Sequence, residues 1–302
     1  MIKENTKFII ATNFPEGSER IEYLDKEIIE PINQVTNSET EILFMPTAAL
    51  MAYSTYKSAG EGKIPIVVPV GGDGTINWHL NNADIYPHST IYLPLASGTA
   101  NDIATTIHIN PTNVRKILEK GRLRQARPLR IQNGPVQKKA LGYIGLGITG
   151  QCAKEINSRK NVKPSLLKDS AVSIKGILKS RRLKVNNSSQ PVLSSNHLEI
   201  AAFNSRMASF LWPKNPSVFE DHFYLLSPEG YIGTAGLAIK GLIKRLKGKK
   251  INLGESVEFE VENIGTKRRP IYGQCDGEEF LLEDSKINIS KNSSPINIFS
   301  LT

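Results

Sequence analysis

The stretch "VVPVGGDGTINW", residues 67–78, places three glycines and an aspartate directly behind a run of β-branched residues. The apolar run is typical of a strand buried on both faces of a sheet, and the residues from about Ile76 onward are typical of a helix. A turn that follows the carboxyl end of a parallel strand and opens a helix is where open α/β sheets bind ligands. This stretch therefore predicts both a fold class and the position of a ligand site.

Residues 1–125 alternate short β-branched runs with segments of helical character. The predicted strands lie at 7–13, 40–45, 64–70 and 89–95, and the predicted helices at 21–35, 47–59, 76–83, 101–107 and 112–120. Such alternation predicts βαβ units and a Rossmann-like parallel sheet covered by helices on both faces.

After about Arg124, strand-like runs follow one another, with only two basic helical stretches between them. The runs lie at 141–148, 198–204, 222–227, 251–254, 257–263, 270–275, 279–284, 286–290 and 296–300. This succession predicts a second, mostly antiparallel β-rich domain over residues 126–302.

The composition limits the cellular setting and the class of partner. The chain of 302 residues carries a formal charge of +9, and residues 151–250 hold 18 Lys/Arg against 6 Asp/Glu. Cys152 and Cys275 are too few for a disulfide framework, no apolar run approaches the ~18 residues that span a bilayer, and no histidines have metal-ligand spacing. We expect a cytoplasmic protein that binds no nucleic acid, because the basic region lacks the motifs of nucleic-acid-binding domains.

The glycine turn has the composition of a phosphate-binding loop. Gly71, Gly72 and Gly74 permit positive φ angles and a close approach of backbone N–H groups to phosphate oxygens. Thr75 can cap the following helix or bind a phosphate. Asp73 indicates phosphoryl transfer, because a carboxylate beside a phosphate is repulsive unless a metal ion or a transferable proton is involved. The alternative is an ordinary turn in which Asp73 caps the helix.

A second turn of the same design occurs in "STIYLPLASGTANDIA", residues 89–104. A predicted strand is followed there by small residues, including Ser97, Gly98 and Thr99, and then by a helix entered at Asn101–Asp102. Two such turns at the same edge of one sheet predict a concave site that is rich in backbone amides and compatible with Mg²⁺.

With both turns in view, the sequence resembles the lipid kinases with a diacylglycerol-kinase-type catalytic domain, which include the sphingosine and ceramide kinases. "GGDGTIN" at 71–77 matches the family's GGDGTxN, "SGTANDIA" at 97–104 its GTxNDxA, and "QCDGEEF" at 274–280 its DGE near the C-terminus. The order and spacing agree over essentially the whole chain. The resemblance implies an α/β nucleotide-binding domain of the NAD kinase and phosphofructokinase type, a C-terminal β-sandwich, and an active site in the cleft between them.

The resemblance also implies roles for individual residues. It implies catalytic carboxylates at Asp73, Glu278 and Asp276, with Glu278 as the first candidate for the base and Asp73 as the second. It implies that the last strand, at about 295–301, returns to the first domain. Around ATP and Mg²⁺ it places Asn13, Gly71, Gly72, Gly74, Thr75, Asn77, Ser97, Gly98, Thr99, Asn101 and Asp102.

Some segments depart from the family's pattern. Trp78 and His79 follow the first motif where the family usually has Glu, and residues 13–18 ("NFPEGS") match its NPxSG loosely. Residues 126–128 ("ARP") lack the usual Asp, and residues 220–222 ("EDH") replace an Asp-Asp-Gly. Those acidic positions are tied to a structural Mg²⁺ in bacterial relatives, so the presence of this second metal is left open.

Two basic segments, residues 172–183 and 231–250, have the pattern of amphipathic helices. In the second, Lys240, Lys244 and Lys247 lie beside an apolar stripe. Such helices bind anionic membrane surfaces. The alternative is that the apolar stripes cover the sheet while the lysines face water.

The leading hypothesis is an ATP-dependent kinase of a lipid hydroxyl such as diacylglycerol, acting as a peripheral protein at the membrane. One alternative is a kinase of a soluble substrate, because NAD kinases and phosphofructokinases also use a GGDG turn, although they lack the second motif. The other is a non-catalytic relative that binds nucleotide or lipid. The sequence does not define the oligomeric state and is compatible with a homodimer.

Overall fold

The chain forms two units, and its C-terminal strand belongs to the first of them. The computed structural model describes residues 5–97, 103, 107, 109, 111–158, 183–186, 196–197, 199–203, 218–219, 223–226, 250–253, 256–263, 271–291 and 294–301. Unit 1 comprises residues 1–127 and 294–302, and unit 2 comprises residues 128–293. The sequence placed the boundary after residue 125, and the structure places it after Arg127.

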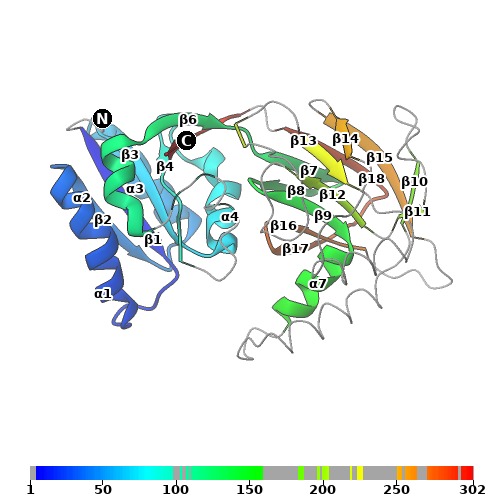
Figure 1. Cartoon of the computed structure of the whole chain (residues 1–302), viewed down its shortest axis with the longest axis horizontal. Helices are drawn as coiled ribbons and strands as arrows, with labels where there is room; N and C mark the ends of the chain where they lie inside the picture. Colours follow the sequence, from blue (N-terminus) through cyan, green and yellow to red (C-terminus); the bar gives the residue numbers. More distant parts are fainter. Residues whose placement is uncertain are drawn as a thin grey trace. The chain divides into compact units, whose positions relative to one another are not determined.

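Unit 1 is built on a seven-stranded sheet in the order β2-β1-β3-β4-β19-β6, with β5 also pairing with β3 (Figure 1). The strands are β1 (Thr6–Thr12), β2 (Glu39–Phe44), β3 (Ile64–Gly71), β4 (Ile91–Tyr92), β5 (Leu95–Ala96), β6 (Arg122–Ala126) and β19 (Ile296–Ser300). All neighbours are parallel except β19 and β6. The prediction of a mostly parallel sheet is confirmed.

Strands β1 and β3 form the centre of this sheet. All seven residues of β1 are buried, and so is every residue of β3 after the first, as expected for strands covered on both faces. On its other side β3 has two short partners, since β4 pairs with residues 66–67 and β5 with residues 70–71. Pro94 lies between these partners and has no N–H group to continue the ladder. The single strand predicted at 89–95 is therefore two strands.

Helices cover the sheet on both faces. They are α1 (Arg20–Leu24), a π-helical segment (Asp25–Ile29), α2 (Glu30–Val35), α3 (Ala48–Gly60), α4 (Asp73–Asn81) and α6 (Val114–Lys120), with short 3₁₀ segments at 83–85 and 111–113. The π-helical segment directly precedes α2, whose second residue is Pro31, and the proline ring disfavours a regular α-turn before it. Since β2 lies on one side of β1 and β3 on the other, right-handed crossovers place α1–α2 and α3 on opposite faces.

Unit 2 is a β-sandwich of two six-stranded antiparallel sheets (Figure 1). One sheet has the order β11-β10-β15-β18-β7-β8 and the other β14-β13-β12-β9-β16-β17. The elements are β7 (Leu129–Asn133), β8 (Val136–Ala140), β9 (Tyr143–Gly147), α7 (Ile148–Asn157), β10 (Leu183–Asn186), β11 (Asn196–His197), β12 (Glu199–Phe203), β13 (Phe223–Leu226), β14 (Lys250–Leu253), β15 (Ser256–Asn263), β16 (Tyr272–Cys275), β17 (Glu278–Leu281) and β18 (Lys286–Lys291). The predicted fold class, an α/β domain followed by an antiparallel sandwich, is confirmed.

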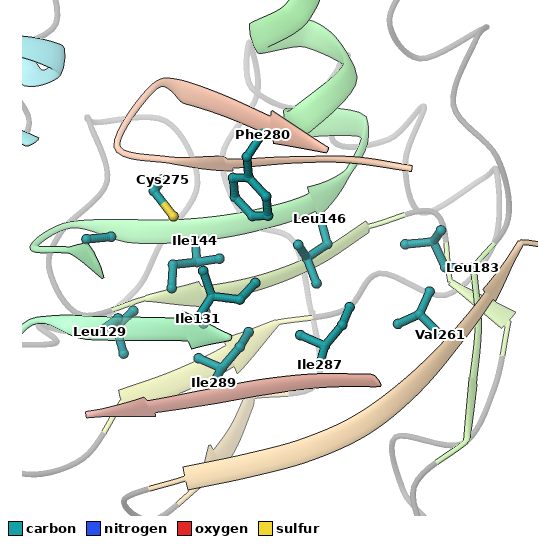
Figure 2. Close-up of a cluster of buried hydrophobic side chains, with 12 residues drawn as sticks. Leu129, Ile131, Ile144, Leu146, Leu183, Val261, Cys275, Phe280, Ile287 and Ile289 are labelled. Atoms are coloured by element: carbon teal, nitrogen blue, oxygen red, sulfur yellow. The ribbon is translucent and has the colours of Figure 1, made fainter. Parts of the chain in front are cut away.

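Apolar side chains from both sheets form the core of unit 2. Ile144 and Leu146 of β9 and Ile287 and Ile289 of β18 have no exposed surface, and Figure 2 shows them in the space between the two sheets. The buried Cys275 belongs to the same cluster. Burial raises the pKa of this thiol well above its usual range, which makes Cys275 a core residue rather than a nucleophile.

Some expectations fall outside the described residues. Residues 172–182, 231–249 and 220–222 lie there, and so do the helices expected from the two basic segments. Within the described part of the chain, no helix is both long and apolar enough to cross a bilayer. The hairpin β7–β8 was not predicted, because its strands alternate with Arg, Gln and Lys and therefore lack an apolar run.

Candidate functional site

Strand β3 ends at Gly71, and helix α4 begins at Asp73 with Gly72 as its N-cap residue. The backbone N–H groups of Thr75 and Ile76 donate to the carbonyl of Gly72 at 3.0 and 3.2 Å. The prediction that the helix starts near Ile76 is therefore wrong. Asp73 and Thr75 lie in the first turn of the helix rather than in a loop.

The N-cap residue of α4 is Gly72, which has no side chain that could cap the helix. The first N–H groups of a helix have no partner within the helix, and the positive end of the helix dipole attracts anions. The alternative in which Asp73 is the capping residue is wrong, since Asp73 is the first helical residue. The amino end of α4 can therefore bind a phosphate through its backbone.

The glycines of this turn have ordinary backbone angles, and the lack of a side chain at Gly71 allows a close contact with Thr75. Gly71, Gly72 and Gly74 are not among the residues with positive φ, so the expectation of left-handed angles is wrong. A Cβ atom on Gly71 would lie 2.6 Å from the Cβ of Thr75, which is closer than real side chains approach. Asn13, in the loop after β1, donates from Nδ2 to Oγ1 of Thr75 at 3.1 Å. The first turn of α4 is thus held by both neighbouring strands.

The residues that flank the second turn lie directly against the first turn. The N–H group of Ser97 donates to the carbonyl of Gly71 at 2.8 Å, and the N–H group of Ile103 donates to Oδ1 of Asp73 at 3.3 Å. These contacts bring the two motifs to one edge of the sheet, as the sequence predicts. The nucleotide contacts expected from Gly98, Thr99, Asn101 and Asp102 lie outside the described residues.

Two observations test whether this edge suits a nucleotide and Mg²⁺. Oγ of Ser97 is buried and has no hydrogen-bond partner in the described part of the chain, which fits a site completed by a bound polar group. The described residues contain no cluster of three or more His, Cys, Asp or Glu. Proteins usually hold Mg²⁺ through one or two carboxylates plus substrate phosphates, and Asp73 supplies one such carboxylate beside the uncapped helix. The residues therefore fit both groups.

Asn77 accepts hydrogen bonds from another residue of α4. Its side chain is 2% exposed, and Nδ2 of Asn81 donates to its Oδ1 at 2.7 Å and to its carbonyl at 2.9 Å. A direct contact of Asn77 with nucleotide stays a prediction. The structure shows instead that Asn77 stabilises the helix that starts at the glycine turn.

His79 lies in the interior of unit 1, in the helix that follows the glycine turn. Its side chain is 2% exposed, and burial lowers its pKa to about 4. The ring of Trp78 stands edge-on to it, with the ring centroids 4.7 Å apart. His79 is consequently neutral at pH 7 and packs as a core residue, a role that only its burial reveals.

The third motif forms the turn of a hairpin in unit 2. Asp276 and Gly277 connect β16 to β17 with φ angles of 47° and 88°, the pair of positive angles that a type I′ turn requires. The carboxylate of Asp276 is buried and accepts three backbone hydrogen bonds from residues 141–143, at 2.7, 2.9 and 2.8 Å. Asp276 therefore anchors the hairpin to the loop between β8 and β9.

Glu278 is one of two exposed acidic residues of this hairpin, the other being Glu279. Glu278 begins β17, pairs with Cys275 across the turn, and has its side chain in solvent. The two carboxylates of this hairpin that were predicted to be catalytic thus differ in environment. Backbone N–H groups hold the side chain of Asp276, whereas the side chain of Glu278 lies in solvent. This geometry favours a positioning role for Asp276 and leaves Glu278 accessible to a substrate. The catalytic roles themselves stay predictions.

Comparisons with known proteins agree with these motifs. Residues 11–133 match a family model described as the diacylglycerol kinase catalytic domain. A solved structure of a diacylglycerol kinase from Bacillus anthracis str. Sterne has a TM-score of 0.64 at 13% identity, covering 98% of this chain and 97% of that one. Two proteins of the same organism, assigned as diacylglycerol kinases, give TM-scores of 0.67 and 0.66 at 14% and 16% identity, with coverages of 98% and 97% of this chain and 97% and 96% of theirs. No curated protein matches in sequence.

The burial of His79 predicts a pH-dependent stability. Its pKa is 6.5 when unfolded and about 4 when folded, so the unfolded chain binds more protons between these values and stability falls as the pH falls. Between pH 7 and pH 5 this contributes a loss of ~2 kcal/mol in the free energy of unfolding. Urea denaturation should show this loss in the parent and not in His79→Gln. The exposed His88→Gln is the control and should keep the parent's slope, whereas parallel curves for parent and His79→Gln would contradict the assignment.

The anchoring role of Asp276 predicts a stability effect that Glu278 does not share. Asn at position 276 offers one acceptor oxygen and one amino group, so at least one N–H of residues 141–143 would face a donor. We expect Asp276→Asn to lower the free energy of unfolding by ~2 kcal/mol and Glu278→Gln to change it by less than ~0.5 kcal/mol. Equal stability of the two variants in urea denaturation would exclude the anchoring role of Asp276.

Proposed function

Because residues 11–133 match the family model of the diacylglycerol kinase catalytic domain, we propose that this protein transfers the γ-phosphoryl group of ATP to a lipid hydroxyl such as that of diacylglycerol. One observation carries the proposal: α4 begins uncapped behind the central strand β3, with a carboxylate at its first residue. The helix end stabilises phosphate charge, and the carboxylate suits a divalent cation that accompanies the phosphates.

The phosphates are proposed to lie over the two adjoining turns. Backbone N–H groups of the first turn of α4 bind phosphate oxygens, and the absence of a side chain at Gly71, Gly72 and Gly74 lets them approach. The buried Oγ of Ser97 offers a further hydrogen bond at the same edge. When bound, Mg²⁺ would neutralise part of the phosphate charge. Asp73 is the residue proposed to hold it.

The acceptor hydroxyl must lose its proton in this reaction. Its oxygen forms a bond to the γ-phosphorus as the bond from that phosphorus to the β-phosphate oxygen breaks, and ADP leaves. Glu278 is proposed to accept the proton, an assistance typically worth ~10²–10⁴-fold in rate. Its exposed position at the start of β17 supports this choice over Asp276. Asp73 is the second candidate for the base.

A lipid acceptor requires contact with a membrane surface. The basic segments at 172–183 and 231–250 have apolar and lysine-rich stripes that suit an anionic leaflet. We therefore propose that the protein is cytoplasmic and binds the membrane peripherally. Each exposed lysine near such a surface contributes roughly 1 kcal/mol.

The phosphoryl-transfer mechanism predicts the behaviour of two isosteric variants. Asp73→Asn and Glu278→Gln should each lower kcat by at least ~10²-fold while retaining the fold, since each removes a charge and keeps the shape. Transfer of labelled phosphate from ATP into a mixed lipid extract measures this. Glu279→Gln is the matched control, because successive strand residues point to opposite faces, and it should keep near-parental turnover.

The same assay separates the three hypotheses. Label in a lipid product supports the proposal, and the product identifies the acceptor. Label found only in soluble acceptors would replace it with a kinase of a soluble substrate. ATP binding without transfer to any acceptor would identify a non-catalytic relative, and near-normal turnover in both Asp73→Asn and Glu278→Gln would exclude the mechanism.

The membrane proposal predicts a loss of vesicle binding on neutralising one stripe. Replacing Lys240, Lys244 and Lys247 with Gln removes at most ~3 kcal/mol of attraction, equivalent to a ~10²-fold weaker binding to anionic vesicles. Turnover of a short-chain, water-soluble substrate should persist. The control replaces Lys26, Lys57 and Lys116, exposed lysines of unit 1, and has the same net charge. Equal co-sedimentation of both triple variants with the parent would show that the stripe is a solvated helix face.

A further inference from the structure

Strand β17, which carries Glu278, lies at the end of its sheet and pairs with β16 in the described part of the chain. On its other side β16 pairs with β9 through residues 273–275. An end strand takes its position from the strand beside it, so the position of Glu278 depends on how firmly β16 is fixed. The carboxylate of Asp276 fixes the turn end of β16.

Helix α7 packs against β16 and contacts its first residue, at the end away from the turn (Figure 1). A Cβ atom on Gly150 would lie 2.1 Å from the carbonyl oxygen of Tyr272 and 2.8 Å from the Cα of Gly273. The helix therefore packs directly on the backbone of the strand. One turn later in α7, the ammonium group of Lys154 donates to the hydroxyl oxygen of Tyr272 and lies 3.9 Å from the centroid of its ring.

The contact with Tyr272 is the polar interaction that the structure gives the side chain of Lys154. Lys154 is half-buried, and among the residues that the structure describes it forms no ion pair with a carboxylate. An ammonium group that is partly removed from water is stabilised by the face of an aromatic ring and by a hydrogen-bond acceptor. Tyr272 supplies both, so this side chain joins α7 to β16.

A second side chain of β16 on the same face is also held by a neighbouring element. Gln274 is 5% exposed, and its Oε1 accepts a hydrogen bond from the hydroxyl group of Tyr143 in β9 at 3.1 Å. Together with Asp276 at the turn, these contacts fix β16 at its first residue, in its middle and at its end.

We propose that Lys154 and Tyr272 form a positioning pair that orients the hairpin carrying Glu278. Glu278 pairs with Cys275, and successive strand residues point to opposite faces, so the side chains of Tyr272 and Glu278 lie on opposite faces of the sheet. The pair consequently acts through the backbone of β16. A displacement of about 1 Å at a reacting group can lower a rate by ~10²-fold. This inference rests on the proposed role of Glu278 as the base.

The turnover of three variants tests the positioning pair. Lys154→Met removes the ammonium group, and we expect it to lower kcat by ~10-fold at an unchanged KM for ATP. Tyr272→Phe removes only the hydroxyl group and should lower kcat by ~3-fold. Lys154→Arg should keep kcat within ~2-fold of the parent, since a guanidinium group also donates to a hydroxyl and stacks on a ring. The exposed Lys116→Met in α6 is the control and should keep the parental kcat.

A double variant separates positioning of Glu278 from a general effect on the fold. If Lys154 acts through Glu278, Lys154→Met should lower kcat by less than ~2-fold once Glu278 is already replaced by Gln. A further ~10-fold loss in that background would overturn the proposal. Parental kcat in both Lys154→Met and Tyr272→Phe would also overturn it.

Amide hydrogen exchange gives a readout that does not depend on turnover. The N–H groups of β17 that bond to β16 exchange through local opening of the hairpin. We expect ~5-fold faster exchange there in Lys154→Met and the parental rate in Lys116→Met. Unchanged exchange in Lys154→Met would overturn the proposal even in an active kinase. Faster exchange in a protein that transfers no phosphate to lipid would support the contact between α7 and β16 and reject the proposed function.

Discussion

The close contact between Gly71 and Thr75 determines how the central strand of unit 1 passes into helix α4. A side chain at residue 71 would overlap the side chain of Thr75, so only glycine lets the helix start directly after β3. The carbonyl of Gly71 then accepts the N–H of Ser97, and Thr75 accepts the side chain of Asn13. The amino end of α4, Ser97 and the loop after β1 all take their positions from this one junction.

Three acidic residues of the sequence motifs have three different physical roles in the structure. Asp73 lies in the first turn of α4 and accepts a hydrogen bond from the N–H of Ile103. Asp276 is buried, and its negative charge is distributed over three backbone donors. Glu278 projects from the edge of the same hairpin. A carboxylate enclosed by backbone donors is suited to holding a turn, whereas an exposed one can exchange protons with a substrate.

Strand β19 links the end of the chain to the sheet of unit 1. It pairs in parallel with β4 and antiparallel with β6. The short strand β4 therefore lies between β3 and β19 and connects the C-terminal strand to the rest of the sheet. The residues just before β19 also line a cavity of unit 1 at the amino end of β4. One C-terminal segment therefore completes both the sheet and the wall of this cavity.

The sequence alone determined the features that depend on local pattern. The apolar run of β3 predicts a strand buried on both faces, and the alternation over residues 1–125 predicts the parallel sheet. Both can be recognised from the sequence because they depend on the pattern of apolar and polar residues in consecutive positions. The Asp-Gly pair at 276–277 indicates a hairpin turn for the same reason, since the required positive φ angles limit the residue types. The family motifs likewise predict a phosphate-binding turn after β3.

Tertiary structure decided whatever depends on residues far apart in the chain. The start of α4 at Asp73, the anchoring of Asp276 by residues 141–143 and the burial of His79 follow from contacts that no local pattern contains. The cavity lined by residues 83–92 and 294–297 exists only because β19 pairs with β4. Hydrogen bonding and burial are properties of the neighbours that folding assembles, so side chains that look alike in the sequence acquire different functions in the fold.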